Sequence, residues 1–364
     1  MSLSKFRYGE IAMKKRVIAG ALTAFVLLVS GCGHVTRLDT SVSSAAGTTV
    51  QSETTSSETE TSETTVPSEP FVFNAHLHSD LLSEVASEEM WESLYNLIDA
   101  IRAGEDTFEC SDEHAYKWCT DDTTIGTFLP PACTLVTGDG YSDGTGKIKY
   151  LMDKDEFMAR ESEFETEIER ILNEAIRSDY SDFEKVMGLY DYMCQNFVYD
   201  YSDIDGQGID DFGSYACLMK KNGICCEIAY VYAYLLLQAG VEATPYGSSC
   251  YHDWTFVKIN GKGYHVDPTW ALHGEYPGDL LYLQYFMMTE AERMEDPQIT
   301  KESLEADMIW PWLSYYDITR FEATDETFKV LHSGCFYMGM NTERNVIYYK
   351  APDGNIKELS YGDM

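Results

Sequence analysis

Residues 252–270 read HDWTFVKINGKGYHVDPTW, and this stretch decides most of what can be expected of the fold. Its two halves are rich in aromatic and β-branched residues, and Asn260-Gly261 between them is a strong signal for a two-residue hairpin turn. With that turn, Asp267 falls opposite Trp254, and His252 lies two residues earlier on the same face. The hairpin therefore predicts an imidazole and a carboxylate within hydrogen-bonding reach, whereas a three-residue turn would place them on opposite faces.

A candidate nucleophile lies upstream, where Gly223-Ile224-Cys225 leads into an almost wholly apolar run at 229–238. That run predicts a buried helix, which Gly240 ends. Cys225 falls in the first turn, where the helix dipole and the backbone N–H groups lower a thiol pKa and could also hold an oxyanion. A cysteine at a helix start is more often a packed apolar residue, so this motif alone is weak evidence.

Together these segments resemble the bacterial transglutaminase-like superfamily. The resemblance is carried by Gly223-Ile224-Cys225, by His252-x-Trp254 and by YHVDPTW at 264–270, and it covers roughly 182–270. It implies a papain-like core and a triad with Cys225 as the nucleophile, His252 as the base and Asp267 as the carboxylate that orients the imidazole. The implied enzyme forms a thioester with a peptide or protein amide and needs no cofactor or metal. Hydrolysis and transamidation both stay open.

The chain also departs from many members of that superfamily. Glu227 and Ile228 follow the cysteine where a glycine and an aromatic residue are common, Thr255 replaces a frequent Asn, and Gly263 stands in place of an aromatic residue. A carboxylate at Glu227 would oppose thiolate formation unless it points away. Glu227, Ile228 and a C-terminal β appendage able to bind a partner favour, as the alternative function, a non-catalytic cell-surface binding module that retains the fold.

Residues 1–32 have the organisation of a lipoprotein signal peptide. Lys14-Lys15-Arg16 precede a short apolar run, and Val29-Ser30-Gly31-Cys32 resembles the lipobox of bacterial lipoproteins. Residues 33–70 are rich in Ser, Thr and Glu, and so polar a segment predicts a disordered tether. We therefore expect export, lipidation at Cys32 and anchoring of the protein at the bacterial cell surface.

The rest of the chain predicts an α+β protein, because helical patterns come first and strand patterns follow. Helices are expected at 84–103, 155–177 and 181–197, a loop-rich stretch at 105–150, and short strands with turns at 328–361. Ser181-x-x-Glu184 is a capping box that opens the third helix. The body is expected to consist of an N-terminal helical part (71–179), a transglutaminase-like core (180–320) and a small β appendage (321–364).

Composition limits the partners. The chain has 61 acidic and 26 basic residues and a net charge of −35, which argues against nucleic-acid binding and favours lysine-bearing or basic substrates. Cys110, His114, Cys119 and Cys133 could be considered a zinc set, but their spacing is irregular. Residues 203–211 resemble a calcium loop that lacks the closing Glu, so we expect no metal at either place. Beyond Cys32 and Cys225, eight cysteines remain that could pair as disulfides.

Overall fold

The computed structural model describes residues 68–83, 85–201, 213–248, 252–272, 280–300 and 321–362. The helices are α2 (Glu88–Arg102), α3 (Glu113–Cys119), α4 (Asp122–Phe128), α5 (Lys154–Ala175), α6 (Asp182–Asn196), α7 (Gly213–Lys220), α8 (Cys225–Gln238) and α9 (Glu290–Arg293). The strands are β1 (Thr107–Glu109), β2 (Val136–Ser142), β3 (Thr145–Tyr150), β4 (Val198–Tyr199), β5 (Asn222–Gly223), β6 (Glu242–Ser248), β7 (His252–Ile259), β8 (Lys262–Val266), β9 (Phe336–Asn341), β10 (Val346–Lys350) and β11 (Ile356–Ser360). Helices and antiparallel sheets share one apolar core, which confirms the α+β class.

Several expected features lie outside the described residues: the signal peptide with Cys32, most of the tether, and the calcium-like loop at 203–211. Within the described part of the chain, none of the helices has the length and hydropathy that crossing a membrane requires.

The N-terminal part of the body departs from the expected pattern at 105–150. The expectation of loops there is wrong, because the segment forms α3, α4 and a three-stranded antiparallel sheet in the order β1-β3-β2. The two helices have seven residues each, and their N-caps are the Asp112 and Asp121 side chains. Strand β2 is glycine-rich, bulged between Gly138 and Gly140 and mostly exposed, so it lacks the apolar alternation that reveals a strand.

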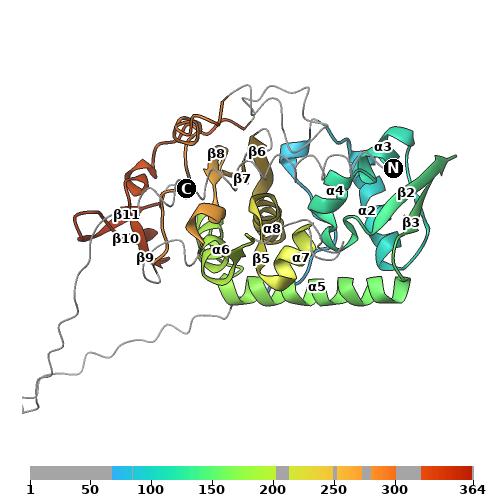
Figure 1. Cartoon of the computed structure of the whole chain (residues 1–364), viewed down its shortest axis with the longest axis horizontal. Coiled ribbons are helices and arrows are strands. Elements are labelled where there is room, and N and C mark those ends of the chain that lie inside the picture. The colour runs from blue at the N-terminus through green and yellow to red at the C-terminus, as the bar shows by residue number, and fades with distance from the viewer. Residues whose placement is uncertain are drawn as a thin grey trace, which may run out of the picture.

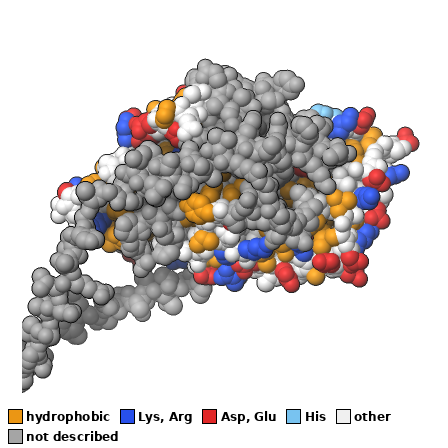
Figure 2. Space-filling view, viewed as in Figure 1, with side chains coloured by type: hydrophobic (Ala, Val, Ile, Leu, Met, Phe, Trp, Pro, Cys, Tyr) orange, Lys and Arg blue, Asp and Glu red, His pale blue; other side chains and the backbone are white. Residues whose placement is uncertain are grey.

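The helices that support the central sheet begin where local signals predicted. In the capping box of α6, the Ser181 hydroxyl accepts the Glu184 N–H, and the Glu184 carboxylate accepts the Ser181 N–H, as expected. The long helix α5 begins at the Asp153 cap and runs along one edge of the body, beneath α6 and α7 in the view of Figure 1. Acidic and basic side chains lie mixed along this edge in Figure 2.

The hairpin has the expected register. Strands β7 and β8 pair from Thr255 with Val266 to Ile259 with Lys262, in the central and edge positions of the antiparallel sheet β6-β7-β8. Asn260 and Gly261 form the two-residue turn, with φ of 48° and 80°. Positive φ at both positions is the geometry that a tight hairpin requires, and glycine adopts it without steric cost.

The C-terminal strands form the expected small sheet, in the order β11-β10-β9, at one end of the body (Figure 1). Tyr361 fixes this sheet to α6, because its ring stacks on Phe183 with centroids 4.3 Å apart. Its hydroxyl also lies 2.6 Å from the Glu184 carboxylate. The C-terminal segment therefore packs on the same helix that supports the central sheet.

Candidate active site

Cys225 is the first residue of α8, as the sequence predicts, and its position is fixed by the turn before it. Strand β5 pairs in parallel with β4, and this pairing aligns Gly223 with Tyr199. Ile224, which follows Gly223, has an extended backbone and is the N-cap residue of α8. A Cβ at Gly223 would lie 2.6 Å from the Cys217 sulfur and 3.0 Å from the Glu227 carboxylate. Only glycine fits there, which gives a steric reason for the glycine two residues before the nucleophile.

The Glu227 carboxylate accepts hydrogen bonds from two backbone N–H groups. One oxygen accepts the N–H of Ile224 at 2.9 Å, and the other accepts the N–H of Gly213 at 2.8 Å. Glu227 therefore acts as an N-terminal cap of α8 and ties it to the start of α7. The residue that departs from the family pattern thus helps to hold the helix that carries Cys225.

His252 and Asp267 meet in the hairpin as the register predicts. Imidazole Nε2 lies 2.6 Å from carboxylate Oδ2, and both side chains are buried, with Asp267 fully excluded from solvent. Asp267 follows β8 as the N-cap of a 3₁₀ helix, η4 (Pro268–Ala271), where its Oδ1 accepts the Thr269 N–H at 3.1 Å. The carboxylate is therefore held at both oxygens before any substrate arrives.

The surroundings of His252 favour its protonated form. Burial lowers the pKa of the imidazole, but the charge and hydrogen bond of Asp267, together with a hydrogen bond to Cys225 and its charge, outweigh burial and raise the pKa to about 9. At neutral pH the ring is thus an imidazolium in contact with both the Cys225 thiol and the Asp267 carboxylate. This is the electrostatic setting in which a cysteine thiolate is stabilised.

Two further contacts fix the ring and the helix relative to one another. The Thr255 hydroxyl, in the middle of β7, donates to the Ala229 carbonyl one turn into α8 at 3.1 Å. The Trp270 indole nitrogen lies 2.6 Å from His252 Nε2. Because Nε2 donates to Asp267 and an indole N–H can only donate, Trp270 does not bond this nitrogen but packs edge-on against the imidazole, with ring centroids 5.3 Å apart. Thr255 thus couples the strand of the base to the helix of the nucleophile.

His265, which belongs to the YHVDPTW string but not to the proposed triad, is a structural histidine. It is fully buried, its Nδ1 accepts the Trp254 indole N–H at 3.0 Å, and its Nε2 lies 2.6 Å from the Glu290 carboxylate. Because Trp254 can only donate, Nδ1 carries no proton and Nε2–H donates to Glu290. The ring therefore orients Trp254 within β7, and both of its nitrogens are engaged outside the candidate triad.

Sequence reasoning missed Arg293. Its Nη2 lies 3.2 Å from Asp267 Oδ2, and its guanidinium lies over the Trp254 ring, 4.1 Å from the centroid. Arg293 is 7% exposed and belongs to α9, more than twenty residues beyond the motif string. The Thr289-x-x-Glu292 capping box could have predicted this helix, but no local signal connects its arginine to Asp267.

The remaining cysteines do not form a second site in the described part of the chain. All eight cysteines in that part, Cys225 included, are free thiols, so no disulfide forms among them. Cys110 and Cys119 point at the backbone carbonyls of Asp112 and Met90, respectively. Across the described ranges, no group of three or more His, Cys, Asp or Glu side chains has a metal-binding arrangement.

Comparison with known proteins finds a family model that matches the part of the chain carrying these residues. Residues 169–268 match the model of the Transglutaminase-like superfamily, and this range contains Cys225, His252 and Asp267. The chain carries a transglutaminase-like domain. No curated protein matches the chain. Among solved structures it is similar to a protein from Cytophaga hutchinsonii described as a putative cysteine protease, with 14% identity and a TM-score of 0.20 over 37% of this chain and 61% of that one. Arg293 and Trp270 lie beyond the residues that match the transglutaminase-like model.

Proposed function

We propose that the protein is a cysteine acyl-transfer enzyme that acts on peptide or protein amides through a thioester. The observation that carries this proposal is the buried His252, bonded both to Cys225 and to Asp267 and with a pKa raised to about 9. An imidazolium beside a thiol at a helix N-terminus gives a nucleophile at neutral pH without a metal or cofactor. The match to the Transglutaminase-like superfamily supports the same chemistry.

In the proposed reaction, the Cys225 thiolate attacks the amide carbonyl carbon, and the C–N bond breaks as the His252 imidazolium gives its proton to the leaving amine. The thioester is then attacked by an acceptor, whose proton passes to the neutral His252, and the Cys225 thiolate leaves. Asp267 stays ionised throughout and holds the ring in one orientation. Each proton that His252 gives in the first half returns to it in the second.

The acceptor that attacks the thioester determines the type of enzyme. Water would make it a peptidase or amidase, and a primary amine would make it a transamidase. We propose lysine-bearing or basic peptides as the favoured partners, because the net charge of −35 attracts cations to the protein surface.

We also propose that the enzyme works outside the bacterial cytoplasm, held at the membrane through a lipid on Cys32. The support is the sequence of 1–32 and the polar spacer at 33–70. Mass spectrometry of the protein from bacterial membranes should find a lipidated Cys32 as the first residue. A retained N-terminal methionine without lipid, or a Cys32→Ser variant that stays equally membrane-bound, would refute this part.

The test of the enzymatic proposal is to incubate the full chain with casein and a biotin-tagged primary amine at neutral pH. Cleaved casein identifies a peptidase, and biotin on casein glutamines identifies a transamidase; either activity must disappear in Cys225→Ala and His252→Ala. Labelling of Cys225 by iodoacetamide that is slow and indifferent to His252→Ala, with no product of either kind, would instead favour a binding module.

A further inference from the structure

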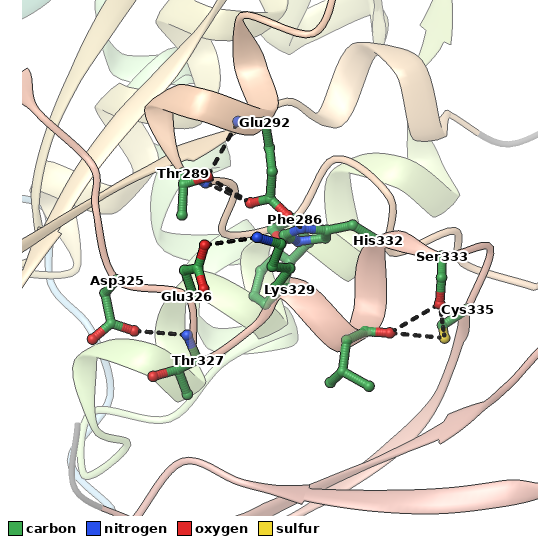
Figure 3. Close-up of polar contacts among 11 residues, drawn as sticks. Phe286, Thr289, Glu292, Asp325, Glu326, Thr327, Lys329, His332, Ser333 and Cys335 are labelled. Atoms are coloured by element: carbon green, nitrogen blue, oxygen red, sulfur yellow. Dashed lines mark hydrogen bonds and ion pairs between the residues drawn. The ribbon is translucent and has the colours of Figure 1, made fainter.

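Helix α9 has only four residues, but three of its side chains are charged and each meets a partner on another element. The pairs are Glu290 with His265 at 2.6 Å, Glu292 with His332 at 2.7 Å, and Arg293 with Asp267 at 3.2 Å. Figure 3 shows how Glu292 is held, between the Thr289 cap of its own helix and the His332 ring. The helix is therefore fixed in place by contacts that do not involve Asp267.

Arg293 is itself held rigidly against the central sheet. Its guanidinium packs on the Trp254 ring at 4.1 Å, and the Trp254 indole is in turn fixed by its hydrogen bond to His265. Stacking on an aromatic face suits the planar guanidinium better than an ammonium group. The positive charge of Arg293 thus has a defined position next to the Asp267 carboxylate.

The Asp267 carboxylate shares one oxygen between two cations. Oδ2 lies 2.6 Å from His252 Nε2 and 3.2 Å from Arg293 Nη2, and Oδ1 accepts the Thr269 N–H. In the proposed reaction the charge on His252 comes and goes, because the ring gives up its proton and regains it. A fully buried carboxylate left without a cation would tend to take up a proton. Arg293 is a cation that keeps its charge at every stage of the cycle.

We infer that Arg293 is a positioning residue of the reacting pair, which acts through Asp267 by keeping that carboxylate ionised and directed at His252. The inference rests on the proposed function, since it assumes that Cys225 and His252 react together. It extends the site beyond residues 169–268, which match the family model, to a helix that follows them.

The pH dependence of Cys225 reactivity gives the sharpest readout. Without Arg293 the buried Asp267 carboxylate loses a cation that holds its charge, so it supports the His252 imidazolium less well, and Cys225 should need a higher pH to react. Among the described residues, the Cys194 thiol of α6 also senses Asp267, because its pKa is raised by burial and by the charges of Asp191 and Asp267. Cys194 and Asp191 are unchanged in the variants below.

The experiment measures the rate of Cys225 alkylation by iodoacetamide against pH in the full chain, by mass spectrometry. All variants carry Cys226→Ser, so that the neighbouring thiol does not react. We expect Arg293→Met to move the acid limb of the profile upward by about 1 pH unit, and Arg293→Lys, which keeps the charge but not the stacked planar group, to restore part of it. Lys329→Met is the matched control, because it removes an exposed cation near α9 and should move nothing.

A double-mutant cycle tests the route of the effect and also covers a failure of Arg293→Met to fold. Arg293→Met combined with Asp267→Asn removes both buried charges, and its profile should match that of Asp267→Asn alone. An unchanged limb in Arg293→Met, an equal shift in Lys329→Met, or additive effects in the cycle would overturn the inference. Failure of the proposed function is seen separately, as the absence of amide turnover in the wild-type protein.

Discussion

Replacing Asp267 by Asn tests whether the charge of this carboxylate, rather than its shape, maintains the reacting pair. Burial lowers the pKa of the His252 imidazole, but Asp267 and Cys225 together outweigh it and raise this pKa to about 9 from an ordinary value of 6.5. That difference of about 2.5 units corresponds to roughly 3 kcal/mol in favour of the imidazolium. Asn is isosteric but neutral, so burial should then dominate and lower the pKa of His252 below 6.5.

The consequence at pH 7.5 can be estimated from these values. With a pKa of about 9 nearly every ring is an imidazolium, whereas below 6.5 less than about a tenth is. We expect Cys225 alkylation at pH 7.5 to fall about tenfold or more, and kcat/KM to fall by about 10²–10⁴. Both quantities should fall rather than rise, because the imidazolium is present at pH values below the pKa of His252 and is lost above it, and the variant lowers that pKa.

The assay is a titration of the histidine ring protons by NMR, with His252→Gln used to assign the resonance. Glu292→Gln is the control, since it neutralises a carboxylate that faces His332 and should leave the His252 titration in place. The reasoning would be refuted by an Asp267→Asn protein whose His252 still titrates near pH 9, or whose Cys225 is alkylated at the wild-type rate.

Three further changes test the supporting structure. Burial, aided by the Glu165 charge, raises the pKa of Glu161 to about 7, so ionisation of this carboxyl destabilises the fold as pH rises from 4.5 to 7. In urea melts, Glu161→Gln should therefore exceed the wild-type free energy of unfolding by up to about 3 kcal/mol at pH 8 and equal it at pH 4. Glu227→Ala removes the acceptor of two N–H groups and should cost about 1–2 kcal/mol in thermal unfolding. Glu227→Gln should recover only part of this cost, because its single amide oxygen can accept one of the two N–H groups. An unchanged Tm in Glu227→Ala would contradict the capping role. Gly263→Ala would place a Cβ 2.4 Å from the Phe256 ring and 2.8 Å from the Glu322 carbonyl oxygen. This crowding should lower the free energy of unfolding by about 1–3 kcal/mol. An unchanged free energy of unfolding would show that the neighbouring groups move aside without cost.

The structure also explains the departures from the family pattern that the sequence left open. Gly263 stands where an aromatic residue is common because Phe256 and the Glu322 backbone occupy the space that a side chain would need. Thr255 keeps a hydrogen bond to α8 through its hydroxyl, and Glu227 caps that helix. Glu227, one of the residues that favoured a non-catalytic module, thus has a structural role beside the site, and so do Thr255 and Gly263.

The sequence by itself determined the parts of the site that depend on short-range rules. The Asn260-Gly261 turn and the alternation of side chains fix which residues of the hairpin share a face, so the contact of His252 with Asp267 could be predicted before any coordinates. The position of Cys225 at the start of a buried helix follows from the apolar run after it. Each of these signals lies within a stretch of about twenty residues.

Only the tertiary structure decided what surrounds that pair. The sheet of β1, β2 and β3 was missed because its exposed, glycine-rich strands carry no apolar alternation. The direction of the Glu227 carboxylate depends on the Gly213 N–H, which belongs to another helix. Arg293 reaches Asp267 because α9 packs beside the central sheet, and packing between segments distant along the chain leaves no periodic trace in either of them.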